Sequence, residues 1–253
     1  MTVIQFGGFV ILSLMLVSCG TTATNQTGST ESVADTYIQL GLGYLQEGNK
    51  DQARFNLLKA IDAEPRSPDA NNAIALLYQS EGELGLAEEH FKRALSSDRS
   101  FNQARYNYAR MLLVDGRADD AEEQFSVLVE DVNYRLRAQA FLGLGMAREA
   151  QSNLDGAKEA YGRSYQRDPR VATALLELAD IAVIEQDFIA AKEFLDQFES
   201  QTAATPRSLE LGIDLAQRFN DADAEASYSM TLRNMFPDSR EAREHILATQ
   251  GEE

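Results

Sequence analysis

The sequence predicts an all-α fold, a right-handed α-solenoid of about six helical hairpins that ends in a C-terminal capping helix. Three observations lead to this prediction. A small residue recurs in phase along most of the chain, a large apolar residue follows it four positions later each time, and turns with Gly and Asp separate the apolar-periodic segments. The length of 253 residues suits such a stack, because stacked repeats need no single large core.

The recurring small residue is an alanine. Successive copies are separated by 34, 34, 36 and 34 residues, at Ala53, Ala87, Ala121, Ala157 and Ala191. The large residues that follow them are Leu57, Phe91, Phe125, Tyr161 and Leu195. Because residues four apart lie on the same face of a helix, each pair indicates one amphipathic helix, and the near-constant period indicates that one hairpin is repeated.

A period of 34 residues with this pattern is typical of the tetratricopeptide repeat. The first copy fills every consensus place, with Tyr37, Leu40, Gly41, Tyr44, Ala53, Leu57, Ala60 and Pro65. Repeats are expected near 34–67, 68–101, 102–135, 138–171, 172–205 and 206–239. The last copy is degenerate because Glu225 stands where the alanine should be, and the polar segment 239–250 is expected to cap the stack.

Small residues also recur on the first helix of each expected hairpin, at Gly41, Ala75, Ala109, Gly145 and Ala179. They should let the two helices of a hairpin approach closely, while large residues at other places fill the space between neighbouring hairpins. The turns at 47–53 and 115–121 carry Gly where one helix should end and Asp where the next should begin.

The N-terminal segment differs from the repeats. Residues 1–18 contain no charged side chain, and the apolar run 9–17 is too short to cross a membrane but fits the core of a signal peptide. Ser18 and Cys19, the only cysteine, follow this run and resemble the lipobox of bacterial lipoproteins. The resemblance implies a lipoprotein signal peptide at 1–18 and acyl chains such as palmitate on Cys19. In such lipoproteins an aspartate after the cysteine tends to retain the protein in the inner membrane, so the resemblance, with Gly20 at this place, points to the outer membrane.

The residues after Cys19 are mostly Thr, Ser, Gly and Asn, which cannot offset the entropy of ordering. We therefore expect 19–33 to be the lipidated cysteine with a flexible polar tether, and 34–253 to be the tetratricopeptide-repeat domain. The alternative, in which Cys19 is a small buried apolar residue, is disfavoured because the segment that follows it has almost nothing to bury.

Composition and motifs argue against catalysis and against nucleic-acid binding. Forty acidic residues against 23 basic ones give a net charge of −17, which repels phosphate backbones. His90 and His245 lie in polar stretches and are interpreted as solvated helix positions. Segment 220–225 lacks the Gly and the terminal Glu of a calcium loop, and the chain has no nucleophile elbow and no Gly-rich phosphate loop. We expect no enzyme, no metal and no cofactor.

The candidate functional surface is the concave face of the solenoid, which the first helix of each hairpin lines. By the repeat register its apolar members are Ile38, Leu42, Leu45, Leu76, Tyr106, Leu113, Leu142, Met146, Leu176 and Val183, and its polar members are Asn72, Gln79, Arg110 and Asp180. Such a groove suits a peptide or a helix of a partner protein, although about half of these residues are expected to pack against the adjacent helix.

The clamp by which some tetratricopeptide domains bind chaperone C-termini needs Lys, Asn and Arg at fixed places. The corresponding places here carry Ile38, Leu42, Ala73, Gln103 and Asn107, so a chaperone-tail adaptor is disfavoured.

The lipobox, the tether and the six repeats together resemble the type IV pilus biogenesis/stability proteins, the PilF/PilW pilotins of Gram-negative bacteria. Segments 37–65 and 71–95 carry the clearest resemblance, with the weakened final copy 223–239. The resemblance implies a monomer that is lipid-anchored at the periplasmic face of the outer membrane. It also implies that the protein binds secretin subunits and promotes their outer-membrane localisation and multimerisation.

The partner-binding groove is expected in the first three repeats, where Ile38, Leu42, Leu76 and Tyr106 make the concave face most apolar. The residues assigned to it are Ile38, Leu42, Leu45, Asn72, Leu76, Gln79, Tyr106, Arg110 and Leu113. The alternative function is a lipid-anchored periplasmic scaffold or adaptor for another envelope assembly or protease system.

Overall fold

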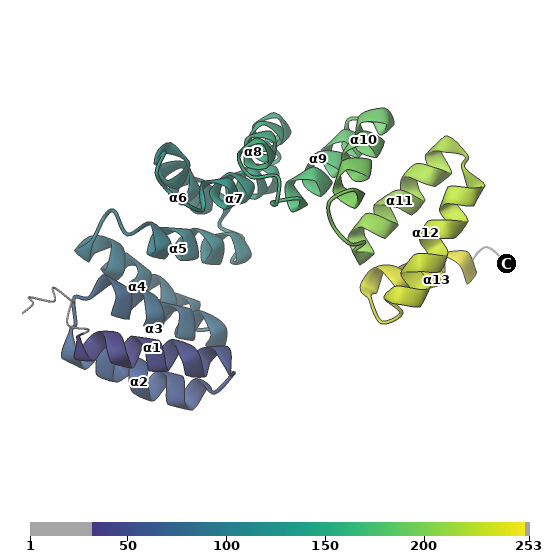
Figure 1. The fold of residues 1–253 in the computed structure, drawn as a ribbon. Helices are drawn as coiled ribbons and strands as arrows, with labels where there is room; N and C mark the ends of the chain where they lie inside the picture. Colours follow the sequence, from purple (N-terminus) through teal and green to yellow (C-terminus); the bar gives the residue numbers. More distant parts are fainter. Residues whose placement is uncertain (1–31, 251–253) are drawn as a thin grey trace, which may run out of the picture. The chain divides into compact units, whose positions relative to one another are not determined.

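The computed structural model describes residues 32–250, with the side chains of residues 249 and 250 excepted. The regular structure of this part of the chain is entirely α-helical (Figure 1). Its thirteen helices are α1 (Val33–Gln46), α2 (Lys50–Ala63), α3 (Pro68–Glu81), α4 (Leu84–Ser97), α5 (Asn102–Val114), α6 (Ala118–Glu130), α7 (Arg137–Ala150), α8 (Leu154–Arg167), α9 (Thr173–Ile184), α10 (Phe188–Glu199), α11 (Pro206–Phe219), α12 (Ala222–Met235) and α13 (Arg240–Gln250).

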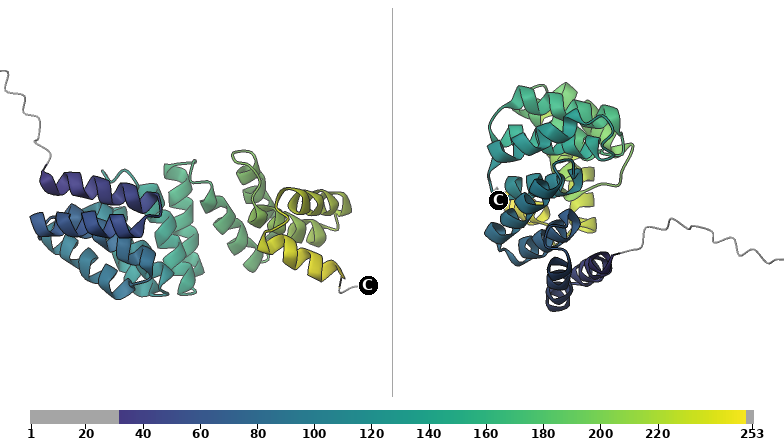
Figure 2. Two further views of the ribbon diagram at one scale, coloured as in Figure 1. Left: turned by 90° about the horizontal axis from the view of Figure 1, so that it is seen from below. Right: turned by 90° about the vertical axis from the view of Figure 1, so that its left-hand side faces the viewer.

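Consecutive helices pack as six antiparallel hairpins, from α1 with α2 to α11 with α12, and α13 contacts both helices of the last hairpin (Figures 1 and 2). The second helix of each hairpin contacts the first helix of the next one. The first helices also contact one another along the start of the stack, since α1 touches α3, α3 touches α5 and α5 touches α7. An all-helical fold of about six tetratricopeptide-type hairpins with a capping helix is therefore confirmed.

The first helix begins at Val33, the last residue of the expected tether, and its N-cap is Ser32. Ser32 is the N-cap of α1, because its Oγ accepts a hydrogen bond from the Asp35 backbone N–H at 3.0 Å and Asp35 Oδ2 accepts one from the Ser32 N–H at 3.0 Å. This capping box satisfies two backbone donors and explains why Ser32 and Val33 belong to the helix start. The expected signal peptide, Cys19 and the rest of the tether lie outside the described residues.

The turn inside each hairpin places one residue in the left-handed region, which ends the first helix. The first three turns use Gly48, Gly82 and Gly116, with φ between +76° and +82°, as the glycines of the turn sequences lead one to expect. The last three turns place Ser152, Gln186 and Asn220 at the same point, with φ between +55° and +63°. The last three turns thus keep the left-handed backbone conformation although they have no glycine at this position.

Glycine allows the close approach expected of the first helices. A Cβ added at Gly41 would lie 2.5 Å from Leu57 Cγ, and one added at Gly145 would lie 2.4 Å from the ring of Tyr161. In both cases the large residue belongs to the same hairpin, whereas Phe125 reaches across to Gly143 of the next hairpin, 2.3 Å from where a Cβ would be. Large residues therefore fill space within hairpins as well as between them.

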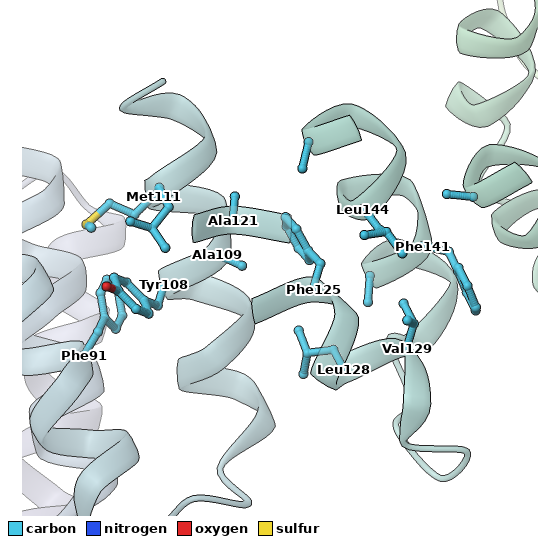
Figure 3. Packing of buried hydrophobic residues seen from close by; sticks show 14 of the residues in the cluster. Phe91, Tyr108, Ala109, Met111, Ala121, Phe125, Leu128, Val129, Phe141 and Leu144 are labelled. Atoms are coloured by element: carbon cyan, nitrogen blue, oxygen red, sulfur yellow. The ribbon is translucent and has the colours of Figure 1, made fainter. Parts of the chain in front are cut away.

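One hydrophobic cluster runs from α3 to α8 and joins three neighbouring hairpins. Within it the rings of Phe91 and Tyr108 lie side by side with centroids 5.9 Å apart, which links α4 to α5 (Figure 3). Tyr106 meets Phe125 edge to face at 6.1 Å and links α5 to α6. Contacts with neighbouring hairpins thus add to those within each hairpin, as in other repeat proteins.

A polar network crosses the same junction between the second and third hairpins. Glu88 on α4 pairs with Arg117 at the start of α6 (Oε2 to Nη1 2.7 Å) and with Lys92 (2.7 Å). The hydroxyl of Tyr108 on α5 donates to Glu88 Oε1 at 2.7 Å. These groups, with Arg117 the largest influence, lower the pKa of Glu88 from 4.5 to about 2.

Acidification is expected to remove the stabilisation that this network provides. Because the pKa of Glu88 is lower in the folded chain than in the unfolded chain, its contribution is complete above about pH 4.5 and is lost as the pH falls toward 2. The difference in the free energy of unfolding between wild type and Glu88→Gln should therefore shrink over this range, in urea titrations followed by circular dichroism. Glu193→Gln, at an exposed position on α10, should show no such trend. A wild-type to Glu88→Gln difference that stays constant over the same range would contradict the assignment.

Candidate partner-binding surface

The first helices of the first three hairpins bring the predicted groove residues together, because α3 contacts both α1 and α5. Leu42 and Leu45 on α1 are half-buried beside the core of the first hairpin, and Leu76 on α3 is half-buried beside the next cluster. Tyr106 and Leu113 on α5 are also half-buried there. These five residues leave part of their apolar surface accessible to a partner.

Three of the residues placed on the concave face are instead buried. Ile38 packs in the core of the first hairpin, Leu176 packs in the cluster of the fifth, and Asn72 is buried beside α5. The reason is geometric, because a groove position and a core position are one residue apart on the helix and the curvature of the stack decides between them. Ile38 and Asn72 therefore support the surface from beneath.

Two polar members of the predicted groove, Asn72 and Arg110, contact other residues of the first helices. Asn107 Nδ2 donates to Asn72 Oδ1 at 2.9 Å, and Gln103 Nε2 donates to Asn107 Oδ1 at 3.2 Å. The guanidinium of Arg110, which is exposed, lies 5.8 Å from the ring centroid of Tyr106. Gln79 is half-buried on α3. Two of the places that carry the chaperone clamp in other domains, Gln103 and Asn107, thus form a chain of amide hydrogen bonds with Asn72 here.

The remaining predicted residues lie farther along the stack. Leu142 and Val183 are half-buried, and Met146 is exposed. Asp180 forms an ion pair with Arg207 and so joins α9 to α11. Leu142 and Met146 lie on α7, which contacts the third hairpin, whereas Asp180 and Val183 lie on α9 of the fifth hairpin.

The structure adds an apolar face on the first hairpin that was not predicted from the sequence. It consists of Tyr37, Leu40, Phe55 and Leu58 and is called here the first-hairpin face. Leu40 is 47% exposed, whereas the residues at the same repeat position, which are Ile74, Tyr108, Leu144 and Leu178, are at most 5% exposed. Each of those four packs against the preceding hairpin, and no helix precedes α1 in the described residues. The repeat register alone could have identified this face.

Lysine covers part of the first-hairpin face. The Lys59 ammonium lies 4.3 Å from the ring centroid of Phe55 and 5.2 Å from that of Tyr37, so one cation bridges the two helices of the hairpin. Phe55 nevertheless remains 55% exposed. The face is apolar and is not covered by another helix within the described residues.

The histidines and the acidic turn have structural surroundings. His90 is buried, which corrects the interpretation that it is solvated, because Tyr78 stacks on its ring at 5.6 Å and Asn71 Oδ1 lies 3.0 Å from Nδ1. Burial lowers the pKa of His90. His245 is half-buried on α13. In the turn 220–225, Asp221 caps α12 by accepting a hydrogen bond from the Ala224 N–H at 3.0 Å.

The described part of the chain contains no group of three or more His, Cys, Asp or Glu that could hold a metal ion. None of its helices is both long enough and apolar enough to cross a membrane.

Comparison with known proteins places these observations in a family. The profile of the tetratricopeptide repeat matches residues 38–99, 72–141 and 142–204. The type IV pilus assembly protein PilF of Pseudomonas aeruginosa is 34% identical over 238 residues, which cover 92% of this chain and 94% of that protein.

Two solved structures are similar over most of their length. The structure of Pseudomonas aeruginosa PilF has a TM-score of 0.76 and 35% identity, and the match covers 87% of this chain and 98% of that one. The structure of PilW, a type IV pilus biogenesis factor, has a TM-score of 0.77 at 24% identity, with 85% and 99% covered, and supports the fold. The chain therefore belongs to the PilF/PilW family of type IV pilus assembly proteins, which are non-enzymatic tetratricopeptide-repeat scaffolds.

Proposed function

We propose that this protein is a pilotin, which binds secretin subunits and promotes their localisation and multimerisation in the outer membrane during type IV pilus biogenesis. The observation that carries the proposal is the end-to-end similarity to a type IV pilus assembly protein, since 92% of this chain aligns with 94% of that one. A scaffold fold alone would be compatible with many partners, because fold does not determine function.

The lipid anchor would supply location. We propose that Cys19 carries acyl chains and that the residues between it and the Ser32 cap act as a tether at the periplasmic face of the outer membrane. Acyl chains contribute roughly 0.8 kcal/mol per buried methylene, so more than one chain makes anchoring stable. A tether of this length spans on the order of 20 Å, which lets the first hairpin meet a partner near the membrane.

The apolar surface of the first hairpins would supply recognition. Leu42 and Leu45 on α1 continue into Leu76 and Tyr106 on the next two first helices, and Leu40 adds exposed apolar surface on another side of α1. The equivalents of Leu40 in later hairpins are each covered by a helix. An amphipathic helix of the secretin subunit would therefore complete the packing that the first hairpin lacks.

The test is to delete the gene and follow heat-resistant secretin multimers in membrane fractions, with complementation by wild type and by variants. Leu42→Asp and Leu40→Asp should each leave multimers at a small fraction of the wild-type amount while monomer accumulates, because a buried carboxylate at an apolar contact costs several kcal/mol. Leu247→Asp, on the exposed surface of α13, should restore the wild-type amount.

Circular dichroism of each purified variant separates loss of binding from loss of fold. Leu40 is the more decisive position, because its exposure means that the substitution does not disturb the core. If secretin multimers persist in the outer membrane of the deletion strain, the pilotin proposal is wrong and the protein serves another client. If multimers are lost on deletion but restored by Leu40→Asp and Leu42→Asp, the function stands and the docking surface is wrong.

A further inference from the structure

A cleft opens between α6 and α8, with α7 as its floor. Its volume is about 430 Å³, and it is lined by Val129 and Glu130 of α6, by Arg137, Phe141 and Arg148 of α7, and by Glu159 and Arg163 of α8, among others. We call it the arginine cleft. None of its residues belongs to the predicted groove or to the first-hairpin face.

Three guanidinium groups lie near the ring of Phe141, two of them from residues that line the cleft and the third from Arg167, one turn beyond Arg163 on α8. The Phe141 ring centroid lies 5.7 Å from Arg137, 5.9 Å from Arg163 and 5.5 Å from Arg167. The ring points away from Phe125 (Figure 3) and is only 3% exposed, so the cations hold it against the helix. Three like charges gathered on one side chain are unexpected in a chain whose net charge is −17.

The fold does not neutralise all of these charges. Arg163 pairs with Glu159 on its own helix at 2.5 Å, and Arg148 pairs with Glu122 at 2.8 Å. Arg137 donates its Nε to the Val129 carbonyl at 2.5 Å, which leaves its two terminal nitrogens for another group. In the described part of the chain, neither Arg137 nor Arg167 is within ion-pair distance of a carboxylate.

The pKa of Arg137 reflects its burial and the cations gathered around it. Burial lowers the pKa of Arg137, and the nearby Arg167 and Arg163 lower it further, while Asp131 acts in the opposite direction. Like charges held close together are relieved when an anion is added between them. A carboxylate suits the site, because a guanidinium presents two parallel N–H donors in the geometry that a carboxylate accepts.

We propose that the arginine cleft binds an acidic segment of a partner protein, whose Asp or Glu carboxylates lie between the guanidiniums of Arg137, Arg163 and Arg167. A chain segment fits better than a lipid surface for two reasons. The cleft runs between two helices, which admits a single chain, and the charge of −17 over the whole protein repels an extended anionic sheet. The proposal goes beyond the pilotin function and does not depend on it.

The test uses the full chain and a fluorescein-labelled octapeptide of alternating Asp and Glu, with the Asn and Gln version as the uncharged probe. In fluorescence anisotropy the acidic peptide should bind and the amide peptide should not. The double variant Arg163→Gln with Arg167→Gln should weaken binding by about tenfold or more, since charge-assisted hydrogen bonds are lost. Arg137 is left unchanged because it also holds the Val129 carbonyl.

Two further variants separate a built site from general attraction. Arg99→Gln removes an exposed cation from the loop before α5 and should leave the affinity within about twofold of wild type, because exposed charges at a distance are screened by salt. Arg167→Lys keeps the charge but loses the paired donors, so it should bind more weakly than wild type. Unchanged thermal melts of the variants show that the fold is intact.

Several results would overturn the proposal. One is that the acidic octapeptide does not bind, or binds no better than the amide peptide. Another is that Arg99→Gln weakens binding as much as the double variant. A third is that vesicles containing phosphatidylglycerol bind through Arg163 and Arg167 while the peptide does not, which would assign the cleft to lipid. A fourth is that light scattering detects a dimer that the double variant abolishes, which would assign it to a second copy of this acidic chain.

Discussion

Tyr161→Ala is expected to lower the free energy of unfolding by about 3–5 kcal/mol, the range measured when large buried aromatic side chains are truncated. Tyr161 is fully buried on α8, and its ring lies against Gly145, where no Cβ could fit beside it. The backbone of α7 cannot move in to fill the cavity, because the two helices are already held at close distance by their other contacts. Urea unfolding followed at 222 nm measures the change.

The matched control is Tyr161→Phe, which keeps the ring and removes the hydroxyl. That hydroxyl donates to Glu149 Oε2 at 2.6 Å, so its loss should cost about 1–2 kcal/mol, as for a hydrogen bond to a charged group. The two variants together separate packing from hydrogen bonding. A Tyr161→Ala variant no less stable than Tyr161→Phe would show that the ring contributes little and that the helices can close over the cavity.

Arg207→Ala is expected to separate the last hairpin from the fifth, at a cost of about 2–4 kcal/mol. Arg207 at the start of α11 binds both oxygens of Glu177 on α9, at 2.8 and 2.6 Å, and also reaches Asp180. Glu177 is buried, so removal of its partner leaves a carboxylate away from water, which typically costs 3–5 kcal/mol. We place the value lower because the Arg207 side chain is 40% exposed and water screens part of the interaction.

Hydrogen exchange locates the effect of Arg207→Ala. Because repeats contact only their neighbours, amides of α11 to α13 should exchange faster than in wild type while those of α1 to α8 change little. Adding Glu177→Gln to Arg207→Ala should recover part of the loss, because the unpaired charge is removed. Arg93→Ala, which breaks an exposed ion pair with Glu89 on one helix, should cost at most about 0.5 kcal/mol. Uniformly faster exchange along the whole chain would contradict a local role for Arg207.

The fold could be read from the sequence because its pattern is repeated. Ala53 with Leu57 indicates little alone, but five such pairs in phase define the hairpin and its neighbours. Helix ends were less predictable, since the capping role of Ser32 depends on a local exchange of hydrogen bonds with Asp35. A polar residue in a Thr- and Ser-rich stretch gives little indication that it begins a helix.

The surface was harder to predict than the fold, because exposure depends on how neighbouring hairpins are oriented. Leu42 and Tyr106 keep accessible apolar surface, while Ile38 and Asn72 are buried. His90 stands in a polar stretch, yet Tyr78 and Asn71 from the previous helix bury it. The arginine cleft brings Arg137 together with Arg163 and Arg167 across two helices, and no spacing along the chain reveals that meeting.

The exposed position of Leu40 leaves the N-terminal end of the described stack without a covering helix. At the other end α13 packs on α11 and α12 and closes the last hairpin. A partner helix packed on the first-hairpin face would take the place that a preceding repeat would occupy. Its interface would stabilise the first hairpin and, through it, the hairpins that follow, as an added repeat does. A partner that docks there would therefore extend the helical stack, so that binding the partner would also stabilise the fold.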